Sequence, residues 1–476
     1  MAAPIRHSPI REHFGFVSQT FTISRAVFAA TAAAAIIVAF LPAPAGAQDG
    51  IMPAAAIIIL AIGLWSTSVV PPYVGALVFL FAAMVAGIAP ANIVFSGFHA
   101  GAMWLVFGGL VIGLAVRQVG VDKRLVNAIL TRFPPHYLAL LYGVALGAGS
   151  LAFVIPSASG RVALLTPIMM ALAERLGFPA DSKGRTGLVL MGTMGTMTPA
   201  FGVLPANVPN MTFYGAIESI YQIQIPYGEY LVTNFPVLGI GGIILYPLVI
   251  FALFREQPKP AEIEGTGGAW SAPERRLTVI LLLALALWIT DTVHGVAPAW
   301  VALGAALVCL LPGVGMIPGK ALGEINYTPL FFLAGVIGLG AVATHAGIGD
   351  AAARQILPVL DLSPETPVRS YASMVGLGWV VAIFTTMPAA PSVLVPMADA
   401  LAEASGWSRN GVLMTQVATW MIFPFPYQAP PVVVAMVLGD LRAAPIIKML
   451  VTYMIVGVIV LLPLHYLWGR WLGVFS

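Results

Sequence analysis

The sequence predicts an all-α polytopic membrane protein with about eleven membrane-spanning helices and two re-entrant hairpins, arranged as two inverted repeats. Three observations predict it. Hydrophobic residues make up 59% of the 476 positions and charged residues only 9%, which is more apolar surface than a soluble chain can bury. The apolar residues form long runs, so the mean hydropathy is +0.94. The second half of the chain repeats motifs of the first.

Most of the apolar runs are too long for the strands of a membrane β-barrel, which need roughly ten residues. Two of the runs, 162–173 and 391–402, are too short to cross a bilayer, and each follows a longer arm and a break rich in Pro, Gly or Ser. We therefore expect re-entrant hairpins there, because broken backbone at membrane depth must be covered by protein or line a cavity. The runs are 27–43, 53–70, 72–88, 102–116, 137–156, 162–173, 187–203, 232–254, 277–292, 296–312, 328–346, 370–386, 391–402, 411–427 and 445–468.

The N-terminal run admits two interpretations. Residues 27–41 are apolar, and Ala45-Gly46-Ala47 resembles a signal-peptidase site. The preceding segment is long for the n-region of a signal peptide, so we expect a first span that is retained.

Three ordered matches define the repeat. ILAIGLW at 59–65 parallels LLALALW at 282–288, and GGLVIGLAVRQVG at 108–120 parallels GVIGLGAVATHAG at 335–347. PIMMALAERLG at 167–177 parallels PMADALAEASG from position 396. The offset stays between 223 and 229 residues, which indicates two copies of one structural unit.

The basic residues orient the chain. With a cytoplasmic N-terminus, one initial span, and five spans plus one hairpin per repeat, 17 of the 22 Lys and Arg residues fall on the cytoplasmic side and 4 outside. This asymmetry agrees with the positive-inside rule, and an odd number of crossings per repeat inverts the second copy. The expected organisation is 1–50 with the first span, 51–255 as the first repeat with hairpin 137–177, a flexible cytoplasmic linker 256–276, and 277–476 as the second repeat with hairpin 369–406.

The remaining basic residue, Arg161, lies in an apolar region beside the apex of the first predicted hairpin, Pro156 to Gly160. A half-helix that begins there directs free N–H groups at the apex, which favours an anion. Ser157, Ala158, Ser159, Gly160 and Arg161 are therefore candidate substrate-binding residues. Because a charge at this depth is costly, Arg161 has two other interpretations: a static partner, such as Asp291 or a set of carbonyls, and snorkelling to the interface.

The second apex, TTMPAAPS from position 385, carries no charge. Thr386 and Pro388 are candidate substrate contacts there, with a packed Pro-rich turn as the alternative. A span interrupted by Pro and Gly follows each hairpin, and Asn207 and Gln428 in these breaks are further candidates, with contacts between helices as the alternative. Freed carbonyls and hydroxyls suggest the ion-binding candidates Ser157, Thr198, Gly202, Thr385 and Tyr427.

Other functional classes have no support in the sequence. The single cysteine, Cys309, excludes an intramolecular disulfide and a thiolate metal cluster. No HExxH, Walker A, nucleophile-elbow or Cys/His ligand spacing is present. We therefore expect no enzymatic activity, no metal site and no cofactor, and the scattered basic residues do not predict nucleic-acid binding. Asp291 ends a span, and a boundary role is expected for it, with a proton relay as the alternative.

The sequence resembles the divalent anion/sodium symporter family, of the ion transporter superfamily, over about residues 27–470. The motifs that carry the resemblance are the PAPAG turn before ILAIGLW, PPYVGAL, GFHAGAMWLVFGGLVIGLAV, and the two hairpins with Pro167 and Pro396. The resemblance implies eleven spans, two opposed hairpins, a dimeric scaffold and transport of dicarboxylates, citrate or sulfate by an elevator motion.

The chain departs from that family at its hairpin apices. Members carry Ser-Asn-Thr there, ten residues before a proline, where this chain has Ser157-Ala158-Ser159 and Thr386-Met387-Pro388. Sodium coupling and dicarboxylate specificity therefore do not follow from the resemblance, and Arg161 is a hypothetical substitute for the charge of a bound sodium ion.

The predicted function is secondary active transport of a small anion by alternating access, with Na⁺ or H⁺ as a possible coupling ion. A cation/proton antiporter of the same superfamily and an anion channel are the alternatives. The expected partners are a small anionic substrate, the lipid bilayer and a second copy of the chain. The expected location is the cell membrane, which is the inner membrane if the source is bacterial.

Overall fold

The computed structural model describes residues 9–43, 48, 50–67, 69–121, 124, 136–155, 157–258, 269–313 and 316–476. Every regular element in these ranges is helical, as the sequence predicts. The candidate cleavage site Ala45-Gly46-Ala47, the apex residue Pro156 and the linker segment 259–268 lie outside the described residues.

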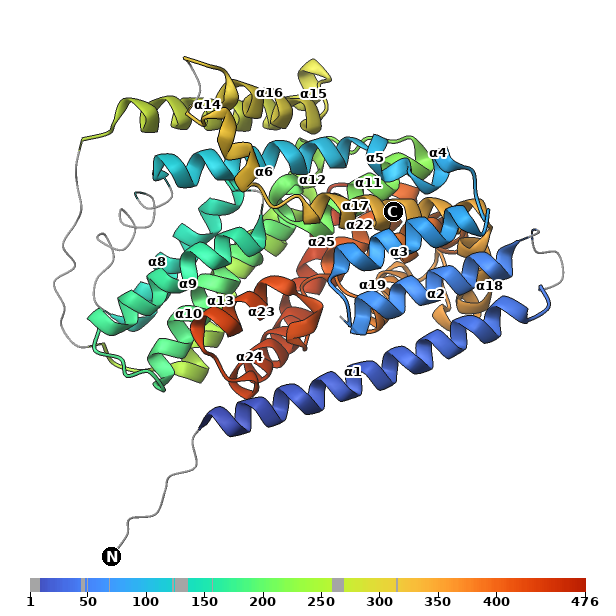
Figure 1. Cartoon of the computed structure of the whole chain (residues 1–476), viewed down its shortest axis with the longest axis horizontal. Coiled ribbons are helices and arrows are strands. Elements are labelled where there is room, and N and C mark those ends of the chain that lie inside the picture. The colour runs from blue at the N-terminus through green and yellow to red at the C-terminus, as the bar shows by residue number, and fades with distance from the viewer. Residues whose placement is uncertain are drawn as a thin grey trace, which may run out of the picture.

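The N-terminal helices form one edge of the molecule. Helix α1 (Pro9–Phe40) lies along α2 (Ile51–Thr67), and α3 (Pro72–Val85) packs on α2 (Figure 1). Two short helices, α4 (Ala91–Val94) and α5 (Ser96–His99), then lead into α6 (Gly101–Val119). Helix α6 matters for the site because one of its faces lines the central cavity.

The region of the first predicted hairpin consists of two helices joined by a break. Helix α8 (Tyr137–Ser150) continues as the 3₁₀ turn η1 (Leu151–Phe153), and the chain then turns into α9 (Ala158–Arg175). Next comes α10 (Lys183–Met197), which packs on both arms of this hairpin. The 3₁₀ turns η2 (Pro199–Gly202) and η3 (Leu204–Ala206) separate α10 from α11 (Val208–Tyr221).

A long bent helix closes this half of the chain. It consists of α12 (Tyr227–Asn234), a π-helical turn η4 (Phe235–Gly239) and α13 (Ile240–Phe254). Because Pro236 has no N–H to donate, the regular α-helical ladder is interrupted at this turn.

The second half presents a similar order of elements. The region of its predicted hairpin consists of α19 (Pro367–Phe384), a break, α20 (Ala390–Leu394), η6 (Val395–Met397) and α21 (Ala398–Ser405). Helix α22 (Arg409–Thr419), the turn η7 (Pro426–Gln428) and α23 (Pro430–Gly439) follow, as α10 and α11 follow the first hairpin. Before the hairpin come α14 (Ala272–Ile289), α15 (Asp291–His294), α16 (Pro298–Leu310), η5 (Gly319–Glu324), α17 (Thr328–His345) and α18 (Ile348–Leu360), and the chain ends with α24 (Ala443–Val456), η8 (Gly457–Leu461) and α25 (Leu462–Trp471).

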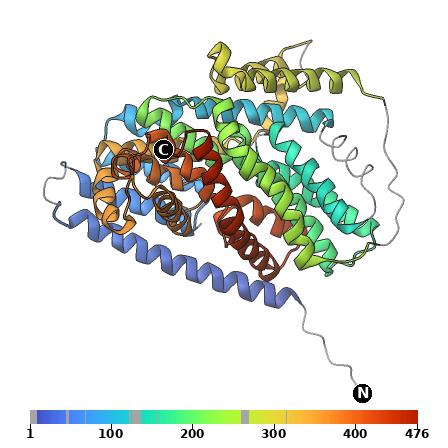
Figure 2. The same cartoon turned by 180° about the vertical axis from the view of Figure 1, so that it is seen from behind.

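The two halves interlock around the centre of the molecule. Helix α23 packs on α9 of the first hairpin, and α11 packs on α20 of the second. The red C-terminal helices lie beside the green α13, which is visible from behind in Figure 2. Helices α14 and α16 cover α6 on the outside (Figure 1). Gly108 permits this contact, because a Cβ there would lie 2.7 Å from the backbone carbonyl of Ala302.

Several helices are suited to a bilayer. Five in the described part of the chain are long and apolar enough to cross it: Gly101–Val119, Tyr227–Phe254, Thr328–His345, Pro367–Phe384 and Ala443–Trp471. Shorter apolar helices surround them, and the outer surfaces of α1, α3, α14 and α25 expose large apolar side chains. The structure therefore has the composition of a multi-pass membrane protein.

Among the described helices of ten residues or more, α11, α18 and α23 lie outside the apolar runs. Helix α11 contains Asn210, Thr212, Glu218 and Ser219, so it does not stand out as an apolar segment. It nevertheless resumes the helical structure after the break at 198–207, as α23 does after the break at 420–429.

A contact through Arg124 attaches the end of the predicted linker, 256–276, to the chain that follows α6. Arg124, which follows α6, pairs with Glu274 in the first turn of α14, donates to the carbonyl of Ala269 at 2.7 Å, and covers the ring of Trp270. The hydrogen bond from Arg124, together with the backbone N–H of Ser271, lowers the pKa of the Glu274 carboxyl to about 2.

Candidate functional site

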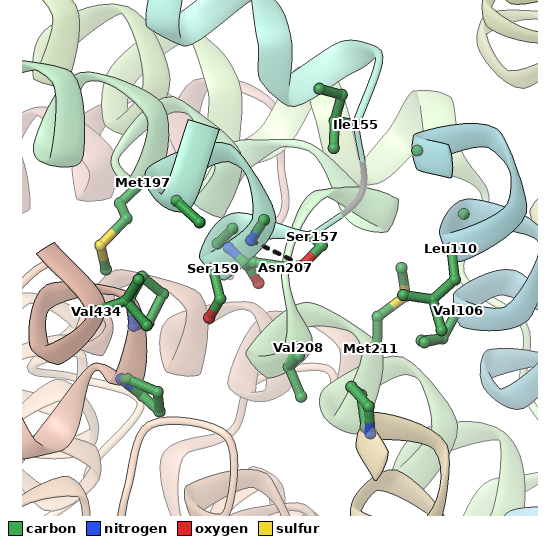
Figure 3. Close-up of a pocket in the computed structure, with 18 of the residues that line it drawn as sticks. Val106, Leu110, Ile155, Ser157, Ser159, Met197, Asn207, Val208, Met211 and Val434 are labelled. Carbon is green, nitrogen blue, oxygen red and sulfur yellow. Dashed lines mark hydrogen bonds between the residues drawn. The ribbon is translucent and has the colours of Figure 1, made fainter. Parts of the chain in front are cut away.

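A cavity of about 490 Å³ lies where the two hairpins meet α6. Its wall comes from the first apex (157–160), the segment that begins α11 (207–211), Met387 and Pro388 of the second apex, residues 428–431 with Val434, and the segment 324–329 before α17. Figure 3 shows Ser157, Ser159 and Asn207 close together at its centre. The fold thus joins segments that lie more than 200 residues apart in the sequence.

The first apex presents the N-terminus of α9 to this cavity. Ser157 is the N-cap residue, and its Oγ accepts a hydrogen bond of 3.1 Å from the Gly160 N–H. Ala158 and Ser159 occupy the first two helical positions, so their N–H groups have no acceptor within the helix. The hydroxyls of Ser157 and Ser159 and the positive end of the helix therefore face the same space.

Asn207 brings a second helix N-terminus to the cavity. Its Oδ1 accepts from the Asn210 N–H at 3.0 Å and caps α11. The other half of the carboxamide, Nδ2, has no hydrogen-bond partner, although the residue is only 3% exposed. A buried donor without an acceptor costs free energy unless a ligand or water satisfies it, which makes Asn207 the strongest candidate for a ligand contact in the site.

The loop that carries Asn207 is held in place by another asparagine. Asn210 Nδ2 donates to the carbonyls of Ala200 at 2.9 Å and Val203 at 2.8 Å. These carbonyls belong to the broken segment between α10 and α11, where no helical ladder satisfies them. The break is therefore a fixed structure.

Arg161 lies behind the first apex and is not part of the cavity wall. Its side chain is 0% exposed, and its guanidinium donates to the Thr196 Oγ1 at 2.6 Å, the Thr196 carbonyl at 3.1 Å, the Ala206 carbonyl at 2.8 Å and the Ile155 carbonyl. Of the interpretations drawn from the sequence, this arrangement corresponds to a static set of carbonyl partners. Asp291 is not among them, since its carboxylate accepts from the Tyr227 and Gly228 N–H groups at the start of α12.

The second apex contributes differently. Met387 and Pro388 line the cavity, but Thr386 does not. The Thr386 carbonyl accepts from the N–H groups of Ala389 at 2.9 Å and Ala390 at 3.0 Å, which closes the turn. The Thr385 hydroxyl donates back to the Val381 carbonyl at 2.8 Å.

Gln428 lines the cavity, but its polar atoms bind the chain itself. Nε2 donates to the Ala382 carbonyl at 3.0 Å, and Oε1 accepts from the Phe425 N–H at 3.1 Å. Its carbonyl accepts from the Met387 N–H at 3.2 Å. Gln428 therefore connects the second apex to the break before α23.

The other ion-binding candidates lie outside the cavity wall. The Thr198 hydroxyl donates to the Met194 carbonyl at 2.9 Å within its own helix, and the Tyr427 hydroxyl donates to the Ile383 carbonyl at 2.7 Å. Close packing explains why residue 202 is glycine, because a Cβ there would lie 2.6 Å from the Cα of Phe235.

Sequence reasoning missed the charged rim of the cavity. Arg117 near the end of α6, and Glu324 and Asn326 before α17, line the cavity and are exposed to solvent. A signal for Arg117 was available, because Val106, Leu110 and Gly113 precede it at helical spacing and all line the same wall.

The chain belongs to a family of membrane transporters. The model of that family, described as the sodium:sulfate symporter transmembrane region, matches residues 24–475, which places the chain in it and confirms the resemblance predicted from its motifs.

Two bacterial relatives and one solved structure are also similar to the chain. A Cupriavidus necator protein named "Membrane protein" is 23% identical over 95% of this chain and 93% of its own length. The Bacillus subtilis protein "Putative malate transporter YflS" is 24% identical over 60% of this chain and 62% of its own. The structure of Neisseria gonorrhoeae MtrF, from a class of antimetabolite efflux pumps, has a TM-score of 0.50 at 14% identity over 94% of each chain. At that identity the likeness concerns the fold alone.

Proposed function

We propose that this transporter is a secondary active carrier of a small organic anion. The observation that carries the proposal is the convergence of two capped helix N-termini, at Ser157 and Asn207, on one cavity that also holds an unpartnered buried amide donor. Free N–H groups at the start of α9 favour an anion, and at α11, where Pro209 has no N–H, the free donor is the Asn207 side chain. The relative whose name includes malate supports an organic anion as the substrate.

The mechanism we propose is alternating access of the elevator type between two inverted repeats. The repeated order of hairpin, broken helix and long bent helix supports the repeats. The cavity wall combines both hairpin regions with α6 and the segment before α17, so it lies where a moving hairpin unit would meet a stationary scaffold. The proposed scaffold would also carry a homodimer contact in the inner membrane.

The rim supports an inward-open arrangement. Arg117, Glu324 and Asn326 line the exposed end of the cavity. Arg117 and Lys320, which shares the turn η5 with Glu324, both belong to segments that the distribution of basic residues assigns to the cytoplasm. In this arrangement the substrate site would open toward the same side as the N-terminus.

In our proposal, the positive charge of the Arg161 guanidinium replaces the charge of a bound cation. Carbonyls at the ends of broken helices are the ligands that transporters offer to Na⁺. Here the carbonyls of Ile155, Thr196 and Ala206 accept hydrogen bonds from one buried, fixed positive charge. We therefore expect substrate binding at the first apex without added sodium.

The antiporter alternative has less support. It requires an acidic ion-binding residue at the site, and Glu324, the one carboxylate among the described residues of the cavity wall, lies at the exposed rim. Asp291 caps α12 instead. A channel and a carrier differ in their transport kinetics, so a counterflow experiment distinguishes them.

The experiment is homo-exchange counterflow. Purified protein is reconstituted into vesicles loaded with millimolar succinate, malate, phenylacetate or hexanoate, and entry of the same labelled anion is measured at pH 8 against empty vesicles, with and without sodium. A carrier gives transient, saturable accumulation of at least one anion, unchanged by sodium. A channel gives equilibration without accumulation, and no protein-dependent movement of any of the four would overturn the proposal.

A further inference from the structure

The two halves of the cavity differ in their hydrogen-bond donors. The first half presents the Ser157 and Ser159 hydroxyls, the unpartnered Asn207 Nδ2, and the free N–H groups at the start of α9. These donors are sufficient to surround a single carboxylate, because its two oxygens accept about four hydrogen bonds.

The second half presents no comparable set among its described residues. Helix α23 begins with Pro430 and Pro431, which have no N–H to donate. The next N–H, of Val432, is bonded to the Ala429 carbonyl at 2.9 Å. The corresponding helix terminus at α11 offers an asparagine, whereas this one offers only proline rings to the cavity.

The second apex is equally poor in donors. Met387 places a thioether side chain on the wall, and its N–H is already bonded to the Gln428 carbonyl at 3.2 Å. Pro388 has no N–H, and one of the two N–H groups on Gln428 Nε2 donates to the Ala382 carbonyl at 3.0 Å, which leaves a single amide N–H at this apex. A carboxylate placed here would lose its hydration and gain little in return, which is unfavourable.

Apolar side chains cover most of the remaining wall. Figure 3 shows Val106, Leu110 and Met211 on one side of the polar centre, and Met197 and Val434 on the other. The wall follows α6 from Val106 to Arg117, and at 1.5 Å per residue this stretch is about 16 Å long. Methionine side chains adapt to apolar ligands of irregular shape.

The rim does not replace the missing donors. Arg117 is the basic residue of the wall, but it is exposed, and the oppositely charged Glu324 lines the same cavity. Solvent and salt screen charges in such positions. Arg117 therefore assists the approach of an anion more than it holds a second carboxylate.

From this asymmetry we propose that the substrate is an amphipathic monocarboxylate, with one carboxylate at Ser157, Ser159 and Asn207 and an apolar hydrocarbon or aromatic body against Met387, Pro388, Pro430 and Pro431. This inference rests on the proposed function, since it names the class of anion that the same carrier would take. It predicts that dicarboxylates and sulfate bind poorly, because a second charge would lie against apolar wall.

The first test is calorimetric titration of the detergent-purified protein with phenylacetate, hexanoate, succinate, malate and sulfate. We expect phenylacetate and hexanoate to bind at least about tenfold more tightly than the other three. Tighter binding of succinate, malate or sulfate would overturn the inference and leave the carrier function intact. Failure of every anion to bind or to show counterflow would remove the carrier function as well.

The second test changes the apolar apex. Met387→Asn places an amide donor against the cavity, and we expect it to raise the affinity for succinate relative to phenylacetate about tenfold. Met387→Leu, the matched control, keeps an apolar side chain of similar volume and should leave the ratio unchanged. An unchanged ratio in Met387→Asn, in protein that elutes as a single species, would contradict the proposal, and the wild-type titration tests it independently of either variant.

Discussion

Arg161 on α9 donates from Nη1 to the carbonyl oxygen of Ala206 at 2.8 Å, immediately before the cavity residue Asn207. The same guanidinium also reaches the carbonyls of Ile155 and Thr196. One side chain therefore joins the first apex, the end of α10 and the cap of α11. It fixes the relative positions of the two helix N-termini that face the cavity.

Replacing Arg161 by Ala should destabilise the protein and abolish transport. Each buried carbonyl left without a donor costs about 1–3 kcal/mol, so we expect a loss of about 3 kcal/mol or more. A thermal-unfolding scan in detergent measures this loss, and counterflow measures transport. Arg354→Ala removes an exposed arginine on α18 and serves as the control. Wild-type stability in Arg161→Ala would show that the carbonyl contacts are dispensable.

Substitutions of Asn207 separate its two roles. Asn207→Ser keeps a neutral oxygen that caps α11 but removes the free Nδ2 donor, so anion affinity should fall at least about tenfold with little loss of stability. Asn207→Ala removes the cap as well and should lower the free energy of unfolding by about 1 kcal/mol more. Titration with anion and thermal unfolding measure the two effects. Equal anion affinity in wild type and Asn207→Ser would exclude Nδ2 as a ligand contact.

Substitutions of the two apex serines should also differ in their effects on stability. Ser157→Ala removes both a hydroxyl that faces the cavity and the cap of α9, so it should lower stability by about 1 kcal/mol and weaken binding. Ser159→Ala removes a hydroxyl of the wall without a capping role, and we expect weaker binding at unchanged unfolding temperature. If both variants titrate like wild type, the anion does not bind at this apex.

Much of this arrangement followed from local signals in the sequence. Apolar runs located most of the helices, and Pro and Gly located the breaks after Met197 and Thr419. Ser157, Ser159, Asn207, Pro388 and Gln428 were predicted as site residues and do line one cavity. Such features depend on helix period, capping and the missing N–H of proline, all of which act within a few residues.

The parts that escaped prediction depend on distant contacts. The direction of the Arg161 side chain is set by carbonyls up to 45 residues away, and no local pattern states that the guanidinium faces away from the cavity. The orientation of the Gln428 side-chain amide depends on the Ala382 carbonyl in another helix. The rim residues Arg117 and Glu324 line the same cavity only because the fold brings α6 and the segment before α17 to its wall.

A buried polar chain links the second hairpin to the C-terminal helix. The Tyr371 hydroxyl on α19 lies 2.8 Å from the His465 Nδ1 on α25, and the His465 Nε2 lies 3.2 Å from the Asn234 Oδ1 at the end of α12. Asn234 Nδ2 donates to the Tyr230 carbonyl at 2.9 Å, which leaves Oδ1 as the acceptor. His465 then donates from Nε2 and accepts the Tyr371 proton at Nδ1.

Tyr371→Phe should therefore destabilise the protein, because the buried Nδ1 of His465 loses its donor, and we expect a cost of about 1–3 kcal/mol. Tyr466→Phe, on the same helix as His465 and with its ring beside Tyr371, is the matched control and should have a smaller effect. Thermal unfolding compares the stabilities of the two variants. Equal unfolding temperatures would show that the chain of hydrogen bonds contributes nothing.

The Glu274–Arg124 pair predicts a pH dependence with a definite sign. The pKa of the Glu274 carboxyl is lowered to about 2 in the folded protein, first by its bond to Arg124, from an ordinary value near 4.3. The carboxylate therefore contributes stability above about pH 4.3, and this contribution disappears as the pH falls from there toward 2. Glu274→Gln should unfold at a lower temperature than wild type at pH 7, and the difference should shrink steadily between pH 4.5 and pH 2.5.

Glu365→Gln, which alters an exposed carboxylate between α18 and α19, should show no such pH-dependent difference. A gap between wild type and Glu274→Gln that stays constant over this range would mean that the pair does not attach the linker to the core.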